Sequence, residues 1–298
     1  MRSCVFLRSA AGAAAGASLA ALKVLLQDEC VLRYDTASQV AVLSMERHSR
    51  KNAIGVNFLS CIQKVIDVCN AGAPCAAAGR PADAVPVRCL IVTSAVPKVF
   101  CAGADLKERK DMSVTQSREF VQRVRHTFNN LEDLPIPTIA AIEGKALGGG
   151  MELALALDMR VAGDGAAVGF PETGLAIIPG AGGTVRAPAV LGVSRALELI
   201  LTAEQVSAQR ALELGLVNRV VPAGSALDAA FDLALRIAKN GPLGVCAAKK
   251  AVRASLGKTR AEAMKVEAEQ YDVVLATEDR LEGLKAFAEH RPPAYEGK

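Results

Sequence analysis

Two carboxylates of the sequence stand in stretches that are otherwise apolar and rich in glycine. Glu152 lies in ALGGGMELALALDMR (146–160), and Glu172 lies in GFPETGLAIIPGAGGT (169–184). Apolar surroundings raise the pKa of a carboxyl group toward the range that suits general acid–base catalysis. Two such groups beside one pocket can hold a water molecule and exchange its protons, so the sequence indicates acid–base chemistry.

The segment 146–160 has the apolar periodicity of a helix. The i, i+3, i+4, i+7 pattern predicts that one helical face is formed by Glu152, Leu155, Ala156 and Met159. Apart from the carboxylate of Glu152, this face is apolar. A structural alternative is that Glu152 interacts only with the dipole at the helix N-terminus, which contributes up to about 1 kcal/mol. The pattern predicts a buried carboxylate without fixing its role.

Glycine clusters precede two predicted helices, and such turns often bind phosphate. Neither GKALGGG nor PGAGGTVR (179–186) has the spacing of a known phosphate loop. Small residues also let backbone amides approach a ligand oxygen, and two converging amides form an oxyanion hole. Residues 148–150 supply one candidate turn, and residues 102–104 in VFCAGADLKER (99–109) supply the second. Residue types alone favour an ordinary strand-to-helix turn at residues 102–104 over an oxyanion site.

Predicted strands and helices alternate over the first two thirds of the chain, which defines an α/β fold. The predicted strands are 30–34, 39–45, 87–95 and 137–144, and the predicted helices are 55–70 and 115–134. Small residues and prolines predict a long surface loop over 71–86. From about residue 182 the pattern is helical, with 216–221 as the only predicted strand.

The formal charge of the chain is +4, from 35 basic and 31 acidic residues among 298. Two of the basic residues are Arg2 and Arg8, so the remainder is nearly neutral, unlike a dedicated nucleic-acid-binding protein. No run has the roughly 18 uninterrupted apolar residues of a membrane span. The eight cysteines contain no C-x-x-C pair and do not cluster with the three histidines, so neither a metal site nor a disulfide framework is predicted.

Residues 1–22 are basic, rich in alanine and free of acidic residues, which is the composition of a mitochondrial targeting segment. A secretory signal is the alternative, because the alanine-rich stretch can serve as its apolar core. Scattered cysteines favour a reducing compartment over secretion. We therefore expect the protein in the mitochondrial matrix.

Four motifs together resemble the enoyl-CoA hydratase (crotonase) family over about residues 30–298. They occur in the order FCAGADLKER, IAAIEGKALGGGMELALALDMRVA, PETGLAIIPGAGGT and DRLEGLKAFAEHRPP. The resemblance implies a core domain over 23–222, built as a spiral of repeated β-β-α units. It also implies a C-terminal helical region over 223–298 that aids trimer formation, and a homo-trimer or homo-hexamer.

The resemblance gives a role to both small-residue turns and to both carboxylates. By motif position, the backbone amides of Ala104 and Gly149 form the oxyanion hole, and Glu152 and Glu172 are the acid–base residues. Family members with other reactions typically lack one or both glutamates. The resemblance therefore implies addition of water across the α,β double bond of a 2-enoyl-CoA. It implies no metal and no cofactor, because coenzyme A is part of the substrate.

The same motif positions imply a binding site for coenzyme A and the acyl group. The expected contacts are Arg50, Lys51, Ala53, Ala102, Asp105, Leu106, Lys107, Lys285 and Phe287. For the three lysines, solvated surface charge is an equally good interpretation, because lysine is so commonly exposed.

Within the family, FCAGADLKER and RLEGLKAFAEHRPPAY are most similar to the AU-RNA-binding 3-methylglutaconyl-CoA hydratase subgroup. This resemblance implies a short branched acyl-CoA of leucine breakdown as an alternative substrate. The subgroup contacts RNA through a lysine-rich helix, whereas the matching segment 51–70 has only Lys51 and Lys64. An RNA-binding protein with vestigial hydratase activity is a further alternative, which the nearly neutral charge does not favour. A third alternative function is double-bond isomerisation by one of the same glutamates.

Overall fold

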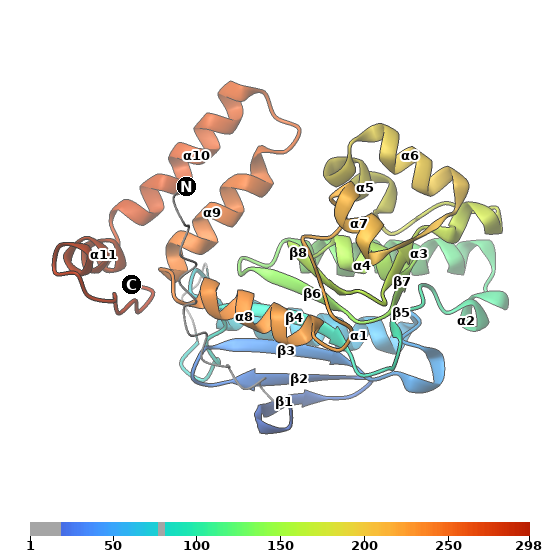
Figure 1. The fold of residues 1–298 in the computed structure, drawn as a ribbon, viewed down its shortest axis with the longest axis horizontal. Helices are drawn as coiled ribbons and strands as arrows, with labels where there is room; N and C mark the ends of the chain where they lie inside the picture. Colours follow the sequence, from blue (N-terminus) through green and yellow to red (C-terminus); the bar gives the residue numbers. More distant parts are fainter. Residues whose placement is uncertain (1–18, 77–80) are drawn as a thin grey trace, which may run out of the picture.

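The computed structural model describes residues 19–76 and 81–298, whose arrangement is shown in Figure 1. Residues 1–18 of the predicted targeting segment lie outside the described residues. In the two described ranges, no helix combines the length and the apolar character needed to cross a bilayer.

A seven-stranded sheet is the larger of two sheets. Its strands, in order across the sheet, are β1 (Lys23–Gln27), β2 (Cys30–Asp35), β3 (Val40–Met45), β4 (Cys89–Ser94), β6 (Thr138–Ile142), β8 (Met159–Gly163) and β11 (Arg219–Val221). The pairs β1–β2 and β2–β3 are antiparallel, and β3, β4, β6, β8 and β11 run parallel to one another. Their continuous apolar runs fit parallel strands that are buried on both faces.

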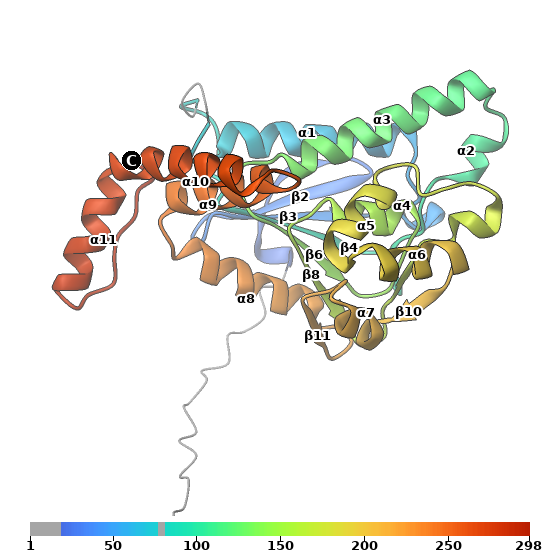
Figure 2. The same ribbon diagram turned by 90° about the horizontal axis from the view of Figure 1, so that it is seen from above.

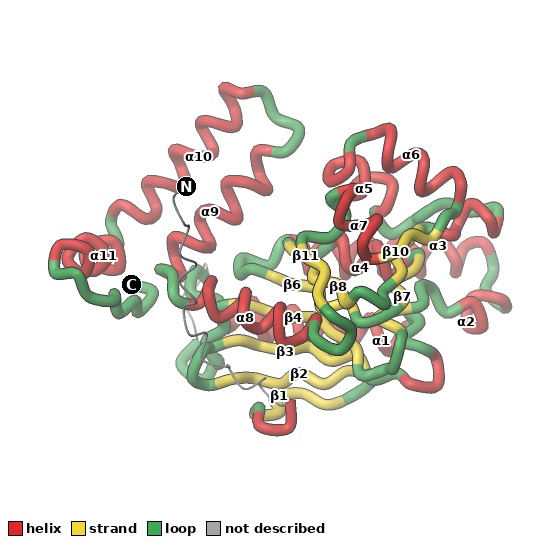
Figure 3. Tube along the Cα trace, viewed as in Figure 1, coloured by secondary structure: helices red, strands yellow, loops and turns green. Residues whose placement is uncertain are grey.

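The smaller sheet has four strands of three residues each. In order across the sheet they are β10 (Gln205–Ser207), β9 (Ala167–Gly169), β7 (Lys145–Leu147) and β5 (Val99–Cys101). The strands β5, β7 and β9 are parallel, so their carboxyl ends lie at one edge of this sheet. The two sets of strands are coloured yellow in Figure 3.

A repeated unit of two strands and a helical segment builds both sheets, which confirms the predicted β-β-α spiral of an α/β fold. In each unit the first strand joins the larger sheet and the second joins the smaller. The helical segments that follow the three units are α2 (Leu106–Lys110) with α3 (Val114–Glu132), α4 (Gly149–Leu155), and η3 (Pro171–Leu175) with α5 (Gly183–Leu191).

Helices cover both faces of the larger sheet. On one face α1 (Val56–Gly72) lies beside α3, as Figure 2 shows. On the other face α8 (Ala226–Ala238) packs against β4, β6 and β8. The buried side chains of α8 are alanines spaced by four residues, which lets this helix approach the strands closely: Ala226, Ala230 and Ala234.

The remaining helical elements lie near the N-terminus of the described chain and in its last third. They are η1 (Leu19–Ala21), η2 (His48–Arg50), α6 (Val193–Thr202), α7 (Ala208–Leu214), α9 (Pro242–Ser255), α10 (Arg260–Leu275) and α11 (Glu278–Ala288). In Figure 1, α10 and α11 extend away from the sheets, and α10 buries none of its residues. Large apolar side chains are exposed on this part of the chain: Met264, Tyr271, Val273, Leu275, Leu281, Leu284 and Phe287.

The long strands and helices predicted from the sequence are confirmed, and the short strands are not predicted. Each of β7, β9 and β10 has three residues, which is too short to show a period. The predicted loop 71–86 begins two residues later, because α1 continues to Gly72. None of the described residues of this loop lines the cavity of the site.

The helix predicted after the glycine triplet, through Met159, is too long at its C-terminal end. The helix α4 ends at Leu155, and Met159 begins β8, so Met159 does not share a helical face with Glu152. The carboxylate of Asp158 accepts hydrogen bonds from the amide and the hydroxyl of Thr138 at 2.8 and 2.9 Å. These bonds hold the chain in line with β6. Because a buried strand follows a buried helix here, the apolar run continues from α4 into β8, and periodicity does not show where the helix ends.

The prediction that the cysteines are unpaired is wrong for one pair. Cys30 of β2 and Cys61 of α1 form a disulfide, although 31 positions separate them in the sequence. The packing of α1 on the larger sheet brings them together, and spacing alone gives no signal of that contact. The thiols of Cys75 and Cys246 remain free and hydrogen-bond to each other.

Candidate active site

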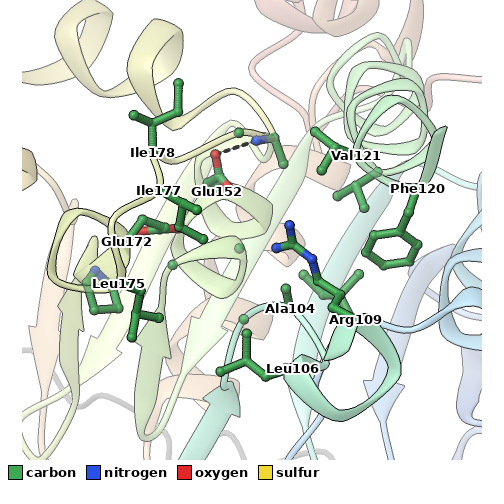
Figure 4. A pocket seen from close by; sticks show the side chains of 18 of the residues that line it. Ala104, Leu106, Arg109, Phe120, Val121, Glu152, Glu172, Leu175, Ile177 and Ile178 are labelled. Carbon is green, nitrogen blue, oxygen red and sulfur yellow. Dashed lines mark hydrogen bonds between the residues drawn. The ribbon is translucent and has the colours of Figure 1, made fainter. Parts of the chain in front are cut away.

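The predicted oxyanion residues and both carboxylates lie just beyond the smaller sheet. Ala104 follows β5, Gly149 follows β7 and Glu172 follows β9. Because these strands are parallel neighbours, the segments after them meet at one edge. Glu152 joins them from the first turn of α4. All four residues line a cavity of about 440 Å³, which is shown in Figure 4.

Two backbone amides of this cavity lie close together. Ile54 pairs with the carbonyl of Gly103 and the amide of Asp105, so the intervening amide of Ala104 has no acceptor among the described residues. The amide of Gly149 is the first of α4 and has no acceptor within that helix. A Cβ atom on Gly149 would lie 3.5 Å from the Ala104 nitrogen. Two amides this close can stabilise one oxyanion.

The glycine triplet is required by the backbone and by the space around it. Gly148 has φ 54° and ψ −123°, a conformation that side-chain-bearing residues rarely adopt. A Cβ atom on Gly148 would also lie 2.8 Å from Oε1 of Glu172. At Gly150 a Cβ atom would lie 2.2 Å from the carbonyl oxygen of Cys101. The triplet therefore allows α4 to start directly against β5 and the carboxylate of Glu172.

Glu152 is a buried carboxylate that a neighbouring loop orients. Glu152 is 3% exposed, and its Oε1 accepts hydrogen bonds from the amides of Ala181 and Gly183 at 2.7 and 2.8 Å. Burial raises the pKa of Glu152, whereas these two amides and Arg186 oppose the rise. The carboxylate is thus fixed in direction, and the two amides and Arg186 limit the rise in its pKa, so that it can still act as a base.

Glu172 is also buried, but one of its oxygens is unpaired. Glu172 is 8% exposed, and its Oε2 has no hydrogen-bond partner among the described residues. Burial and the charge of Glu152 raise the pKa of Glu172 to about 7. Leaving a buried polar atom unpaired costs about 1–3 kcal/mol, which a bound water or substrate can offset. At neutral pH this group can both donate and accept a proton.

Arg186 holds the loop that orients Glu152. Its guanidinium donates to the carbonyl of Ala181 at 3.1 Å and to the carboxylate of Glu132 at 2.7 Å. Glu132 also accepts from Arg253 of α9 at 2.6 Å. The position of Glu152 is therefore linked through one partly buried ionic network to α3 and to α9.

Replacing Arg186 by Met is expected to lower the free energy of unfolding by about 3 kcal/mol, because it removes the bond to the buried Ala181 carbonyl and one of the two ion pairs of Glu132. Urea denaturation followed by circular dichroism measures the change. The matched control is Arg210→Met, which removes the exposed ion pair of Arg210 with Glu213 and is expected to change stability by less than about 0.5 kcal/mol. Equal losses in the two variants would contradict the structural role of Arg186.

The predicted coenzyme A contacts of the first half of the chain lie at or beside the cavity. Ala102 and Leu106 line it. The carbonyl of Lys51 accepts from the amide of Ala102 at 3.1 Å, which places the segment with Arg50 and Ala53 next to the cavity wall. Lys107 is exposed on α2.

Asp105 differs from these neighbours because its carboxylate is used within the fold. It is buried, it caps α2 by accepting from the amides of Lys107 and Glu108, and it pairs with Arg47 at 3.0 Å. Its contribution to the site is to hold the turn that carries the Ala104 amide.

Lys285 and Phe287 are not brought to the cavity within one chain. Both lie on α11, which Figure 1 shows at the opposite end of the chain from α2. Phe287 is 83% exposed. A contact between these residues and a ligand in the cavity would require α11 of another copy.

Several cavity residues were not predicted from the sequence. They come from α2 and α3 and from the segment at and after η3, and they are Arg109, Phe120, Val121, Val124, Arg125, Leu175, Ile177 and Ile178. The periodicity of α3 predicts that Phe120 and Val124 share an apolar face. It does not show whether that face meets the core or a cavity.

The chain belongs to the enoyl-CoA hydratase/isomerase family, whose sequence model matches residues 35–298. A relative from Arabidopsis thaliana, described as a probable mitochondrial enoyl-CoA hydratase, is 44% identical over 87% of this chain and 82% of its own length. The mitochondrial methylglutaconyl-CoA hydratase of Mus musculus is 40% identical over 93% of this chain and 86% of its own.

Solved structures agree with this assignment. The crystal structure of an enoyl-CoA hydratase from Bacillus anthracis superimposes with a TM-score of 0.82 and 41% identity. The match covers 93% of this chain and 99% of the bacterial chain. The family and the fold that the motifs implied are therefore both confirmed.

Proposed function

We propose that the protein is an enoyl-CoA hydratase that adds water across the α,β double bond of a 2-enoyl-CoA thioester. The observation that carries this proposal is the unpaired Oε2 of Glu172, which is buried in the same cavity as Glu152 and the two free amides. Hydration requires one group that takes a proton from water and one that gives a proton to carbon. A pair of carboxyl groups with one proton between them meets that requirement.

In the proposed mechanism, the thioester oxygen accepts hydrogen bonds from the amides of Ala104 and Gly149. Glu152 removes a proton from the water as its oxygen forms a bond to Cβ, and the π electrons move toward the thioester oxygen. The two amides stabilise the resulting enolate. Glu172 then gives its proton to Cα. The pair holds one proton before and after the reaction, so proton exchange between the two carboxyls restores the starting state.

The proton count of this pair predicts a bell-shaped dependence of kcat/KM on pH. Below the acidic limb both carboxyls are protonated and no base remains. As the pH rises through about 7, the group with the raised pKa, Glu172, loses its proton and the acid is lost. We expect kcat/KM to fall about tenfold per pH unit well above that limb. Hydration and dehydration should give the same pH profile, because in both directions the active enzyme holds one proton on the two carboxyls. A value of kcat/KM that still rises above pH 8 would contradict the role of Glu172 as the acid.

Activity itself is tested with purified protein and crotonyl-CoA, by following the loss of absorbance of the conjugated thioester. A substrate with its double bond at the 3,4 position separates hydration from isomerisation, because an isomerase converts it to the 2-enoyl thioester. Absence of hydration on crotonyl-CoA, on longer 2-enoyl-CoA thioesters and on 2-enoyl-CoA thioesters with a terminal carboxylate would refute the proposal.

The second candidate function is hydration of 3-methylglutaconyl-CoA, the reaction that the name of the mouse relative states for that protein. A side-by-side comparison of rates on crotonyl-CoA, a long-chain enoyl-CoA and 3-methylglutaconyl-CoA distinguishes the two functions. The mitochondrial names of two relatives and the composition of residues 1–22 support a place in the mitochondrial matrix.

We also propose that the active form is a homo-trimer or homo-hexamer. The support is that Lys285 and Phe287, which the resemblance assigns to coenzyme A binding, lie far from the cavity of their own chain. The exposed apolar side chains of α10 and α11 offer a surface for another copy. Light scattering on the purified protein measures the mass, and a monomer that is fully active would refute this proposal.

A further inference from the structure

One charged side chain of the cavity has no role in the mechanism described above. Arg109 lies in α2, one turn after Leu106, and its side chain extends into the cavity. Figure 4 shows the guanidinium between the catalytic residues on one side and Phe120 and Val121 on the other. It is half-buried, so part of its hydration shell is lost.

The guanidinium of Arg109 has no partner among the described residues, because only the backbone of Arg109 takes part in the hydrogen bonds found there. Most of the other buried or half-buried arginines among the described residues have partners. Arg47 binds three carboxylates, Arg160 donates to backbone carbonyls and Arg186 joins the network of the base. An arginine kept in an apolar wall without a protein partner points to a ligand that supplies one.

The other charges of the cavity do not pair with Arg109. Glu152 is bound by the amides of Ala181 and Gly183, and Glu172, with a pKa raised to about 7, carries only part of its negative charge at neutral pH. The neighbouring Arg125 adds a second positive charge at the cavity and donates to the carbonyl of Gly180. The wall formed by α2 and α3 is therefore positive, and it complements an anionic group.

The acyl part of the substrate is the part that meets this wall. The amides of Ala104 and Gly149 fix the thioester, and the charged residues expected to bind coenzyme A are absent from the lining of the cavity. The interior is lined instead by apolar side chains, among them Phe120, Leu175 and Ile178. An apolar interior with one unpaired guanidinium fits a short hydrocarbon chain that ends in an anion.

We propose that Arg109 binds a carboxylate at the far end of the acyl chain, so that the preferred substrates are 2-enoyl-CoA thioesters with a terminal carboxylate. This inference rests on the proposed hydratase function and names its substrate class. In the absence of that carboxylate the guanidinium stays half-buried and unpaired in the complex. Arg109 is therefore a specificity-determining residue, and its contribution appears as a difference between two substrates.

The test compares glutaconyl-CoA with 2-pentenoyl-CoA, two thioesters of equal acyl length that differ by a carboxylate in place of a methyl group. The measured quantity is the ratio of their kcat/KM values. We expect this ratio to favour glutaconyl-CoA in the wild type and to fall about 10- to 100-fold in Arg109→Met, the loss that accompanies removal of a charged hydrogen bond. Arg109→Lys keeps the charge without the two-pronged geometry and should recover part of the ratio.

Two further measurements keep the result unambiguous. Arg118→Met, a control on the exposed face of α3 outside the cavity, should leave the ratio unchanged. The inhibition constants of glutaryl-CoA and pentanoyl-CoA as competitive inhibitors measure the same preference at the level of binding, even if turnover in the variant is slow. A hydratase whose ratio is the same in wild type and Arg109→Met overturns this inference and leaves the proposed function intact. A wild type that hydrates neither thioester overturns both.

Discussion

Replacing Glu172 by Gln is expected to lower kcat for hydration of crotonyl-CoA about 10³-fold, because an amide cannot give a proton to Cα. The substitution retains the size of the side chain, and Oε2 has no hydrogen bond to lose. Replacing Glu152 by Gln is expected to have an effect of similar size, because the base is lost. The amide oxygen of Gln at that position can still accept from Ala181 and Gly183, so the loop remains in place.

The two substitutions should not be additive, because the two carboxyls act on one water molecule and share one proton. We expect the double variant to be about as slow as the slower single variant. The control is Glu119→Gln on the exposed face of α3, which should leave kcat unchanged. Folding is checked by thermal unfolding of each variant. A single variant that keeps more than a tenth of the wild-type kcat would remove that residue from the mechanism.

The second large effect is expected from removing one amide of the oxyanion hole. Gly149 occupies the first position of α4, where proline fits a helix well and where its missing N–H disrupts no helical hydrogen bond. Gly149→Pro therefore deletes the proposed oxyanion donor and leaves the helix ladder complete. The loss of one such donor lowers kcat about 10²- to 10³-fold.

Gly149→Ala is the matched control for this substitution. A Cβ atom at this position lies 2.9 Å from Cδ1 of Ile54, so both variants carry the same steric contact. Ile54→Val removes that terminal methyl group, and both variants can be made in this background. The expected result is a kcat that is about 10²- to 10³-fold lower for proline than for alanine, measured with crotonyl-CoA. Equal values would show that the Gly149 amide does not stabilise the reaction.

The four residues that the motifs singled out as the site line one cavity, whereas the elements around them were predicted less closely. Both glutamates and both amide-bearing turns were found from residue type, position and motif order. The helix over 146–160 was drawn too long, since the apolar run passes from α4 into β8 without a break. The three-residue strands that place Ala104, Gly149 and Glu172 side by side gave no periodic signal.

Arg109 illustrates the other limit of sequence-based prediction. In the sequence it is one of several charges in DLKERK, and nothing in that run marks it apart from Lys107 or Lys110. The fold separates them, because only the helix face shared by Leu106 and Arg109 turns toward the cavity. The disulfide between Cys30 and Cys61 was missed for the same reason.

The sequence by itself determined the chemical groups of this protein: two carboxylates in apolar surroundings, and glycines where a backbone amide must be approached. These are local properties, set by residue type and by the conformation that each type permits. The tertiary structure decided which groups meet, how burial raises the pKa of Glu172 to about 7, and which charged residue of the run 105–111 faces the cavity. Those properties depend on distances between segments far apart in the chain, and such distances exist only once the two sheets have formed.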